Sequence, residues 1–209
     1  MDVAFSLAAV LAAYLVGSLS FAVIVSRVVG LADPRSYGSK NPGATNVLRS
    51  GNKQAAIATL VLDAVKGWLP LWAAGVWGPG LGFGDLTLAG VGLAAFVGHL
   101  YPVFFQFKGG KGVATAVGVL FGVDWLLALA CLVTFGVVLY ASRFVSLASM
   151  VAAVFAPAYF LFGSGVAWAA SPPTVGALVA MGGLLIWRHR ENVSRLLQGT
   201  ESKLGSQKK

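Results

Sequence analysis

Long apolar runs are the feature of this sequence that most restricts its fold. Seven runs, each bounded by glycine, proline or charged residues, follow one another with short connections: Val3–Ser26, Gln54–Trp77, Leu86–Phe107, Gly112–Val123, Trp125–Ser142, Val145–Phe162 and Thr174–Trp187. A helix needs about 20 mostly apolar residues to cross a bilayer. The runs therefore predict an all-α membrane protein with about seven transmembrane helices, the fourth of them short.

Composition agrees with this fold class. Of the 209 residues, 57% are hydrophobic and 11% charged, whereas soluble domains carry about 25% charged residues. A water-soluble globule is excluded, and we expect residues 1–209 to form a single polytopic membrane domain. The N-terminal run lacks the basic start of a signal peptide and is expected to be retained as the first span. The polar residues 200–209 are predicted to form a flexible tail.

Basic residues fall almost entirely in alternate connections. Fourteen of the fifteen Lys and Arg residues follow the first, third, fifth and seventh runs. The positive-inside rule makes these connections cytoplasmic, with the N-terminus outside and the C-terminus in the cytoplasm. Accessibility mapping that placed Lys108 and Arg143 on opposite faces would contradict this orientation. The excess of basic over acidic residues also suits anionic lipids or substrates better than nucleic acid.

Polar residues gather in three segments of the basic connections. In the first, 37–51, three glycines and a proline alternate with Ser39, Asn41, Thr45, Asn46 and Arg49. Glycine lets successive backbone N–H groups turn toward one point, where they bind anions. Pro42 would suit the first turn of a helix whose N-terminus faces a ligand. A plain polar turn between spans is the alternative.

The second and third segments carry more basic residues. In 107–113, Lys108 and Lys111 flank a Gly-Gly pair, so ammonium groups and backbone donors can converge on a phosphate. The spacing is not that of a Walker A loop, and a basic interfacial turn is the alternative. In 187–202, His189 and Asn192 are three residues apart and share a helical face, unless this segment is simply an interfacial amphipathic helix.

A few polar residues lie inside the apolar runs. Asp63 and Lys66 are three residues apart and are predicted to form a structural pair, with a proton relay as the alternative. His99 is either a general base or a hydrogen-bonded packing residue. Cys131 is the only cysteine, which excludes an intrachain disulfide or a cysteine cluster. Two histidines without a carboxylate cluster predict no catalytic zinc, and we expect no metal or cofactor.

The sequence therefore predicts two phosphate-sized cationic pockets on the cytosolic face of a membrane protein. Such pockets suit an enzyme that joins a phosphorylated, water-soluble molecule to a lipid. A transporter of phosphorylated anions would also use basic loops, but would need charges and broken helices at the bilayer midplane. A non-catalytic scaffold of lipid synthesis would need no ordered phosphate sites.

The segments GSKNPGATNVLR, GHLYPVFFQFKGGKGVAT and RHRENVSRLLQGTE, with LDAVKG in the second run, closely resemble the bacterial acyl-phosphate:glycerol-3-phosphate acyltransferases over nearly the whole chain. The resemblance implies a seven-helix inner-membrane enzyme of phospholipid synthesis whose active site faces the cytoplasm. Such an enzyme transfers a fatty acyl group from acyl phosphate to the 1-position of glycerol 3-phosphate, giving lysophosphatidic acid and inorganic phosphate. Contact with the soluble enzyme that forms acyl phosphate is also expected.

The resemblance also assigns roles to individual residues. It implies that Ser39 and Arg49 are essential. It implies a phosphate cradle made by Lys108, Gly109, Gly110, Lys111 and Gly112. It implies further substrate contacts by His189, Asn192 and Ser146, and a structural role for Glu201. Lys40 departs from the family, in which small residues such as glycine are common at this place.

The sequence contains no evident Ser–His–Asp set, so we predict direct attack of the glycerol 3-phosphate hydroxyl on the acyl carbon. Acyl phosphate has a good leaving group, and positioning with charge neutralisation supplies much of such catalysis. Arg49 and Lys108 would offset phosphate charge. Donors to acyl phosphate would come from Asn41, Gly43, Thr45 and Asn46. The acyl chain would lie between spans.

Overall fold

The computed structural model describes residues 3–205, and its named elements in that range are all helices. The chain divides into two compact units, Met1–Val123 (unit 1) and Asp124–Lys209 (unit 2). Each unit has its own helix packing and is described by itself. The expectation of a single membrane domain stays a prediction.

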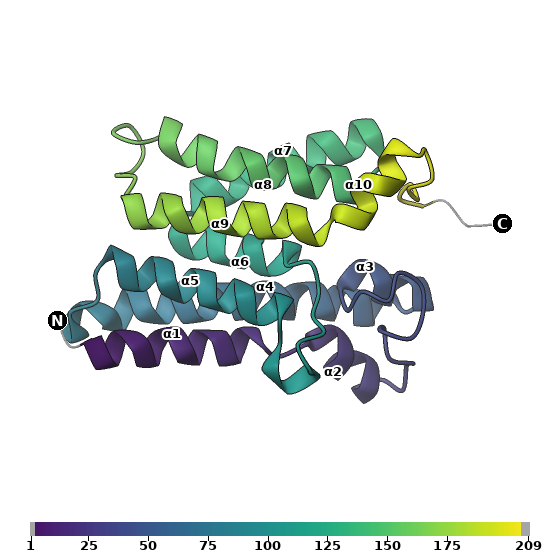
Figure 1. Ribbon diagram of the computed structural model, residues 1–209, viewed down its shortest axis with the longest axis horizontal. Coiled ribbons are helices and arrows are strands. Elements are labelled where there is room, and N and C mark those ends of the chain that lie inside the picture. The colour runs from purple at the N-terminus through teal and green to yellow at the C-terminus, as the bar shows by residue number, and fades with distance from the viewer. Residues whose placement is uncertain (1–2, 206–209) are drawn as a thin grey trace. The chain divides into compact units, whose positions relative to one another are not determined.

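Unit 1 is built on four long helices joined by shorter ones (Figure 1). Its elements are α1 (Val3–Gly17), α2 (Phe21–Val28), α3 (Ala44–Val47), η1 (Leu48–Ser50), α4 (Lys53–Trp77), η2 (Gly78–Leu81), α5 (Asp85–Leu100), η3 (Val103–Phe105) and α6 (Val113–Val123). Helix α1 packs on α4 and α5, and α4 packs on α5 and α6. The fourth predicted span is indeed short, since α6 has 11 residues.

Glycines bring the long helices of unit 1 into close contact. A Cβ atom on Gly118 of α6 would collide with the carbonyl oxygen of Ala64 in α4, and one on Gly67 would collide with that of Thr115. Gly118 and Gly122 are four residues apart, the spacing at which small residues let membrane helices pack closely. A Cβ on Gly122 would also press on Leu71 of α4.

The first apolar run is not one continuous helix. Helices α1 and α2 are bent by 43° relative to each other, and Ser18–Ser20 form the break. Within residues 3–205, four helices are long and apolar enough to cross a membrane, or five if this bent pair is one span. Helices α6 and α9 fall short of the required length. Seven crossings therefore stay a prediction.

Unit 2 contains three long helices and a short one: α7 (Trp125–Ser142), α8 (Val145–Phe162), α9 (Pro172–Arg188) and α10 (Arg190–Leu197). Helix α8 packs on both α7 and α9. The bounds of α7 and α8 are those of the predicted runs, because a charged residue or a glycine lies within two residues of each helix end. Asp124, for example, caps α7 by accepting hydrogen bonds from the N–H groups of Leu126 and Leu127, at 2.7 and 3.1 Å.

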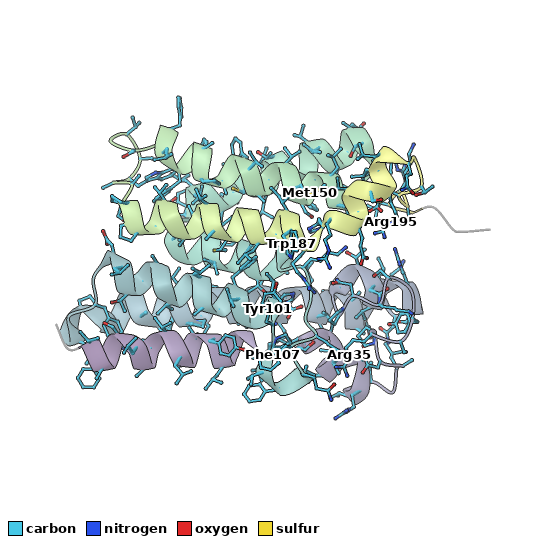
Figure 2. All side chains as sticks on the ribbon, in the orientation of Figure 1. Arg35, Tyr101, Phe107, Met150, Trp187 and Arg195 are labelled. Carbon is cyan, nitrogen blue, oxygen red and sulfur yellow. The ribbon has the colours of Figure 1, made fainter. Side chains whose placement is uncertain are left out.

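Within each unit, the basic connections gather at one end. In unit 1, residues 30–52 and 101–112 lie together at the end where α5 finishes and α4 and α6 begin (Figure 1). Arg35 and Phe107 lie there (Figure 2). In unit 2, Arg143 after α7 donates from Nη2 to Leu204 O at 2.9 Å, and Leu204 N donates to Arg143 O at 2.7 Å. The predicted orientation of the termini in a membrane is not tested by these contacts.

The polar segment after α10 makes specific contacts as far as it is described. Glu201 and Leu204 both take part in hydrogen bonds with earlier residues. Residues 206–209 lie outside the described residues, so the flexible tail expected over 200–209 stays a prediction there.

Candidate active site

One buried side chain holds the first polar segment in shape. Asn46 is 2% exposed. Its Nδ2 donates to Pro34 O at 2.7 Å and to Tyr37 O at 3.2 Å, while its Oδ1 accepts from the N–H of Ser39 at 3.0 Å. The amide group predicted to contact acyl phosphate is thus already bonded to the backbone of its own loop.

Ser39 and Arg49 lie on the open side of this loop, next to Gly38. Both side chains are exposed. Gly38 has φ +58°, and a Cβ atom there would collide with Asn46 Oδ1 and lie 3.3 Å from Arg49 Nη1. Lys40 also has a positive φ, of 54°. Because glycine adopts such a backbone without strain, the geometry explains why the family resemblance implies a small residue there.

The helix predicted after Pro42 begins later than expected. Gly43 is the N-cap and α3 starts at Ala44, so Pro42 lies before the helix rather than in its first turn. Gly43 adopts an extended backbone, which delays the turn. Pro42 in the first helical turn was therefore a wrong expectation, and α3 has only four residues. Nearby, Asn41 is half-buried and Thr45 is exposed.

An ion pair that the sequence reasoning missed supports this loop. Arg35 Nη2 lies 2.6 Å from Asp33 Oδ2, and the guanidinium lies 5.9 Å from the centre of the Phe105 ring. The hydrogen bonds from Arg35 hold the pKa of Asp33 below its usual value. The pair therefore connects residues 33–35, just before the first polar segment, to η3, just before the second. The spacing of Asp33 and Arg35, two residues apart, is the sequence signal that could have indicated this ion pair.

The glycine-rich second segment packs on His99 and on the first segment. Gly109 and Gly110 are buried, Lys111 is half-buried and Lys108 is exposed. Gly110 N donates to His99 O at 3.1 Å. A Cβ on Gly110 would collide with His99 Nε2 and lie 3.0 Å from Pro42 O. The two predicted phosphate-binding segments therefore adjoin within unit 1.

The second segment ends in a turn that only glycine adopts readily. Gly112 has φ +88°, and a Cβ there would collide with the Phe96 ring. Its carbonyl accepts from Ala116 N at 2.7 Å, which starts α6. The expected position of this segment, at the start of the short fourth helix, is confirmed.

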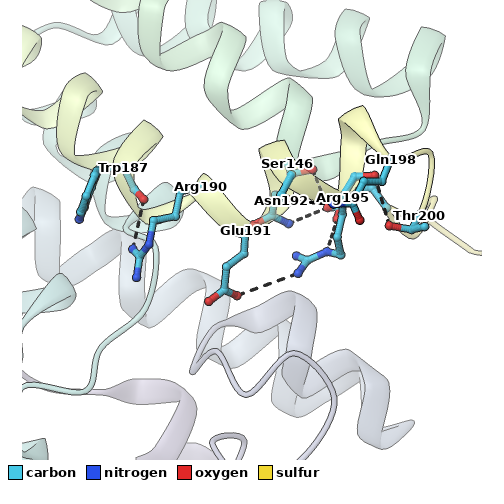
Figure 3. A network of polar contacts seen from close by, with 10 residues as sticks. Ser146, Trp187, Arg190, Glu191, Asn192, Arg195, Gln198 and Thr200 are labelled. Atoms are coloured by element: carbon cyan, nitrogen blue, oxygen red, sulfur yellow. Dashed lines mark hydrogen bonds and ion pairs between the residues drawn. The ribbon is translucent and has the colours of Figure 1, made fainter.

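The third segment forms a network around Glu201 in unit 2 (Figure 3). Glu201 Oε1 accepts from Ser146 Oγ at 2.7 Å and from Asn192 Nδ2 at 2.6 Å, and Oε2 accepts from Arg195 Nε at 2.7 Å. His189 is buried at the junction of α9 and α10, with Nδ1 2.8 Å from Leu185 O. The predicted substrate contacts Ser146 and Asn192 thus share one carboxylate.

The charge of Glu201 should make this network sensitive to acid. Burial raises the pKa of the carboxyl, but hydrogen bonds from Ser146, Asn192 and Arg195 outweigh burial and hold it below its usual value. A lowered folded-state pKa stabilises the fold at neutral pH, and the contribution is lost as pH falls through that pKa. We expect Glu201→Gln to cost about 1–2 kcal/mol between pH 7 and the ordinary glutamate pKa of 4.5, and progressively less from there toward pH 3, as measured by unfolding.

Glu191→Gln is the matched control. Glu191 is exposed, and its Oε2 lies 4.0 Å from Arg195 Nη1, so its loss should change stability by less than about 0.5 kcal/mol. If Glu201→Gln and wild-type protein lost stability in parallel over this pH range, the network would not depend on the Glu201 charge.

Comparison with known proteins places the chain in a family. The family model for glycerol-3-phosphate acyltransferase matches residues 7–199. The chain belongs to this family. It is 63% identical over 201 residues to the glycerol-3-phosphate acyltransferase of Albidiferax ferrireducens, covering 96% of this chain and 90% of that protein. It is 58% identical to that of Bordetella petrii, covering 98% and 95%.

Solved structures give the same result. The chain is similar to the crystal structure of PlsY, an integral membrane glycerol 3-phosphate acyltransferase, in its glycerol 3-phosphate form, with TM-score 0.84, 40% identity and 96% of each chain covered. The lysophosphatidic acid form gives TM-score 0.82, with 96% of this chain and 95% of that chain covered.

The present acyltransferase is therefore a multi-pass membrane enzyme. The family decides against the transporter and scaffold alternatives. The structure of unit 1 brings the two glycine-rich segments together, and unit 2 joins Ser146 to Asn192 through Glu201. Among residues 3–205, no group of three His, Cys, Asp or Glu side chains is placed to hold a metal ion.

Proposed function

We propose that this enzyme transfers a fatty acyl group from acyl phosphate to the sn-1 hydroxyl of glycerol 3-phosphate, yielding lysophosphatidic acid and inorganic phosphate. The observation that carries the proposal is the pair of adjoining glycine-rich segments in unit 1, with exposed Arg49 on one and exposed Lys108 on the other. Both substrates carry a phosphate, and cationic side chains together with backbone N–H donors suit phosphate. The glycerol 3-phosphate and lysophosphatidic acid forms of PlsY support this choice of acceptor and product.

The chemistry needs no acyl-enzyme. The acceptor hydroxyl attacks the acyl carbon, the new ester C–O bond forms, and the C–O bond to the phosphate breaks. The hydroxyl proton passes to a phosphate oxygen of the substrates, so a strong protein base is not required. The protein orients the two substrates and offsets the charge on the departing phosphate, which are the effects that accelerate such a transfer.

Residue roles follow from position within each unit. In unit 1, Arg49 and Lys108 neutralise phosphate charge, and Ser39 presents its hydroxyl beside Gly38. Further donors there are Asn41, Thr45, Gly109, Lys111 and Gly112, while Gly43 and Gly110, whose N–H groups already donate to Asn41 O and His99 O, shape the two segments. We assign Asn46 to hold the first loop, because a substrate contact would require it to give up its present bonds. In unit 2, His189, Asn192 and Ser146 contact substrate.

The donor and the mechanism are tested with purified protein in lipid nanodiscs. Glycerol 3-phosphate is offered with palmitoyl phosphate or palmitoyl-CoA, and the product is separated into 1-acyl and 2-acyl isomers. We expect 1-acyl lysophosphatidic acid from palmitoyl phosphate alone. Equal turnover with palmitoyl-CoA would contradict the donor. An acylated protein seen by mass spectrometry when glycerol 3-phosphate is omitted would contradict direct transfer.

We further propose that the enzyme lies in the bacterial inner membrane, with the basic end of each unit in the cytoplasm. The gathering of basic connections at one end of each unit supports this orientation. In this arrangement glycerol 3-phosphate reaches Arg49 and Lys108 from the cytoplasm, while the acyl chain stays in the bilayer.

A further inference from the structure

A buried polar cluster lies beneath the glycine-rich loop of unit 1. It consists of Asp63 and Lys66 on α4 and His99 near the end of α5, which are 2%, 2% and 6% exposed. Lys66 Nζ lies 2.7 Å and His99 Nδ1 3.6 Å from the same Asp63 oxygen, Oδ1. The predicted pairing of Asp63 with Lys66 is confirmed. Its extension to His99 was not foreseen.

Lys66 connects this cluster to the break between α1 and α2. Its Nζ donates to Leu19 O at 2.6 Å, between the end of α1 and the start of α2. Carbonyl groups at the end of a helix lack intrahelical partners and need others when buried. The ammonium group supplies one and thereby joins α4 to the place where the chain bends.

His99 connects the cluster to the loop that contains Gly109 and Gly110. Its Nδ1 edge faces Asp63, and its Nε2 edge lies so close to Gly110 that a Cβ atom on that residue would collide with it. Its carbonyl oxygen accepts from Gly110 N and would collide with a Cβ on Gly109. Gly109 and Gly110 therefore both pack on His99, Gly110 on its ring and both glycines on its carbonyl group.

We infer that Asp63, Lys66 and His99 are positioning residues for the loop Lys108–Gly112. Asp63, balanced by Lys66, orients the imidazole, and the imidazole together with its carbonyl sets where Gly109 and Gly110 lie. Lys108 directly precedes these glycines, so their position also determines where Lys108 lies. The inference rests on the proposed function only in naming phosphate as the ligand of the loop.

The first test needs no substrate. In full-length protein, hydrogen exchange of the peptide covering residues 107–113 is compared between wild type and the double variant Asp63→Asn/Lys66→Met, which leaves no unpaired buried charge. We expect about tenfold faster exchange in the double variant. Thr87→Val is the matched control, because it removes the partly buried hydrogen bond between Thr87 Oγ1 and Ser6 Oγ, 3.0 Å, at the other end of α5.

Thr87→Val should lower thermal stability without changing exchange of the loop. Equal exchange of the loop in the double variant and wild type would overturn the inference. This outcome is independent of the acyl donor. If wild-type protein formed no lysophosphatidic acid while exchange responded as expected, the proposed function would be wrong and the positioning role would stand.

A kinetic test separates positioning from general stability. We expect the double variant to raise the KM for glycerol 3-phosphate about tenfold with a smaller change in kcat, since the binding loop is displaced. Thr87→Val should leave that KM unchanged. A fall in kcat at constant KM would contradict a role through the phosphate loop.

The contact between His99 and Gly110 is tested by a double-mutant cycle. His99→Ala removes the ring, and Gly110→Ala adds the methyl group that the ring would obstruct. Each single variant should raise KM. The combination should be no worse than the more damaging single variant, because the methyl group then occupies the vacated space. Effects that multiply would show that the two positions act independently.

Discussion

Replacing Arg49 with alanine is expected to lower kcat/KM for acyl transfer about 100- to 1000-fold, the loss typical when one charged or donor group at a developing oxyanion is removed. The guanidinium is exposed beside Gly38 and Ser39, with its Nη1 3.3 Å from where a Cβ of Gly38 would lie. It is thus free to meet a phosphate group. The measurement is lysophosphatidic acid formation by purified protein from palmitoyl phosphate and glycerol 3-phosphate.

Arg27→Ala is the matched control for this variant. Arg27 is exposed in the last turn of α2, at the same basic end of unit 1. Its removal takes away the same charge without touching the loop, so we expect less than about a threefold change in kcat/KM. Arg49→Lys should fall between the two, because lysine keeps the charge but not the paired donors. Equal losses of kcat/KM in Arg49→Ala and Arg27→Ala would mean that acyl transfer depends on the summed positive charge of this end of unit 1 and not on Arg49 itself.

The helices could be predicted from the sequence where strong local signals end them. Helices α7 and α8 begin and end as expected because Asp124, Arg143 and Gly163 interrupt apolar runs with few other polar residues. The first run was harder. Gly17, Ser18 and Ser20 interrupt it only with small uncharged residues, and the bend is stabilised by Lys66, a residue 47 positions away from the carbonyl that it satisfies. Such a distant contact leaves no trace in local periodicity.

The candidate site was predictable in its residue types but not in its connections. Glycine and lysine spacing indicated a phosphate loop, yet nothing in that spacing showed that Gly110 packs on His99. The amide of Asn46 was expected to face substrate and instead holds the loop. An asparagine in a polar loop has the same sequence signature in either role. Only the positions of Pro34 O, Tyr37 O and Ser39 N around its amide distinguish the role in holding the loop from the role in contacting substrate.

Gly118→Ala is expected to lower the free energy of unfolding by about 2–3 kcal/mol, the cost of forcing an extra methyl group into a closely packed contact. The new Cβ would collide with the carbonyl oxygen of Ala64, which is backbone and cannot rotate aside. Helices α4 and α6 must therefore separate. Because α6 begins directly after Gly112, this separation also moves the start of α6 and the phosphate loop, so acyl transfer should fall with stability.

Gly75→Ala makes the same substitution on α4 where the structure leaves room, since a Cβ there meets nothing within 4 Å. Alanine favours a helix over glycine by about 1 kcal/mol, so this variant should be as stable as wild type or more so. Both are measured by detergent-induced unfolding in mixed micelles. If Gly118→Ala were as stable as Gly75→Ala, the close contact between α4 and α6 would not exist in the membrane. A loss confined to Gly118→Ala would show that this contact, and not helix propensity, requires the glycine.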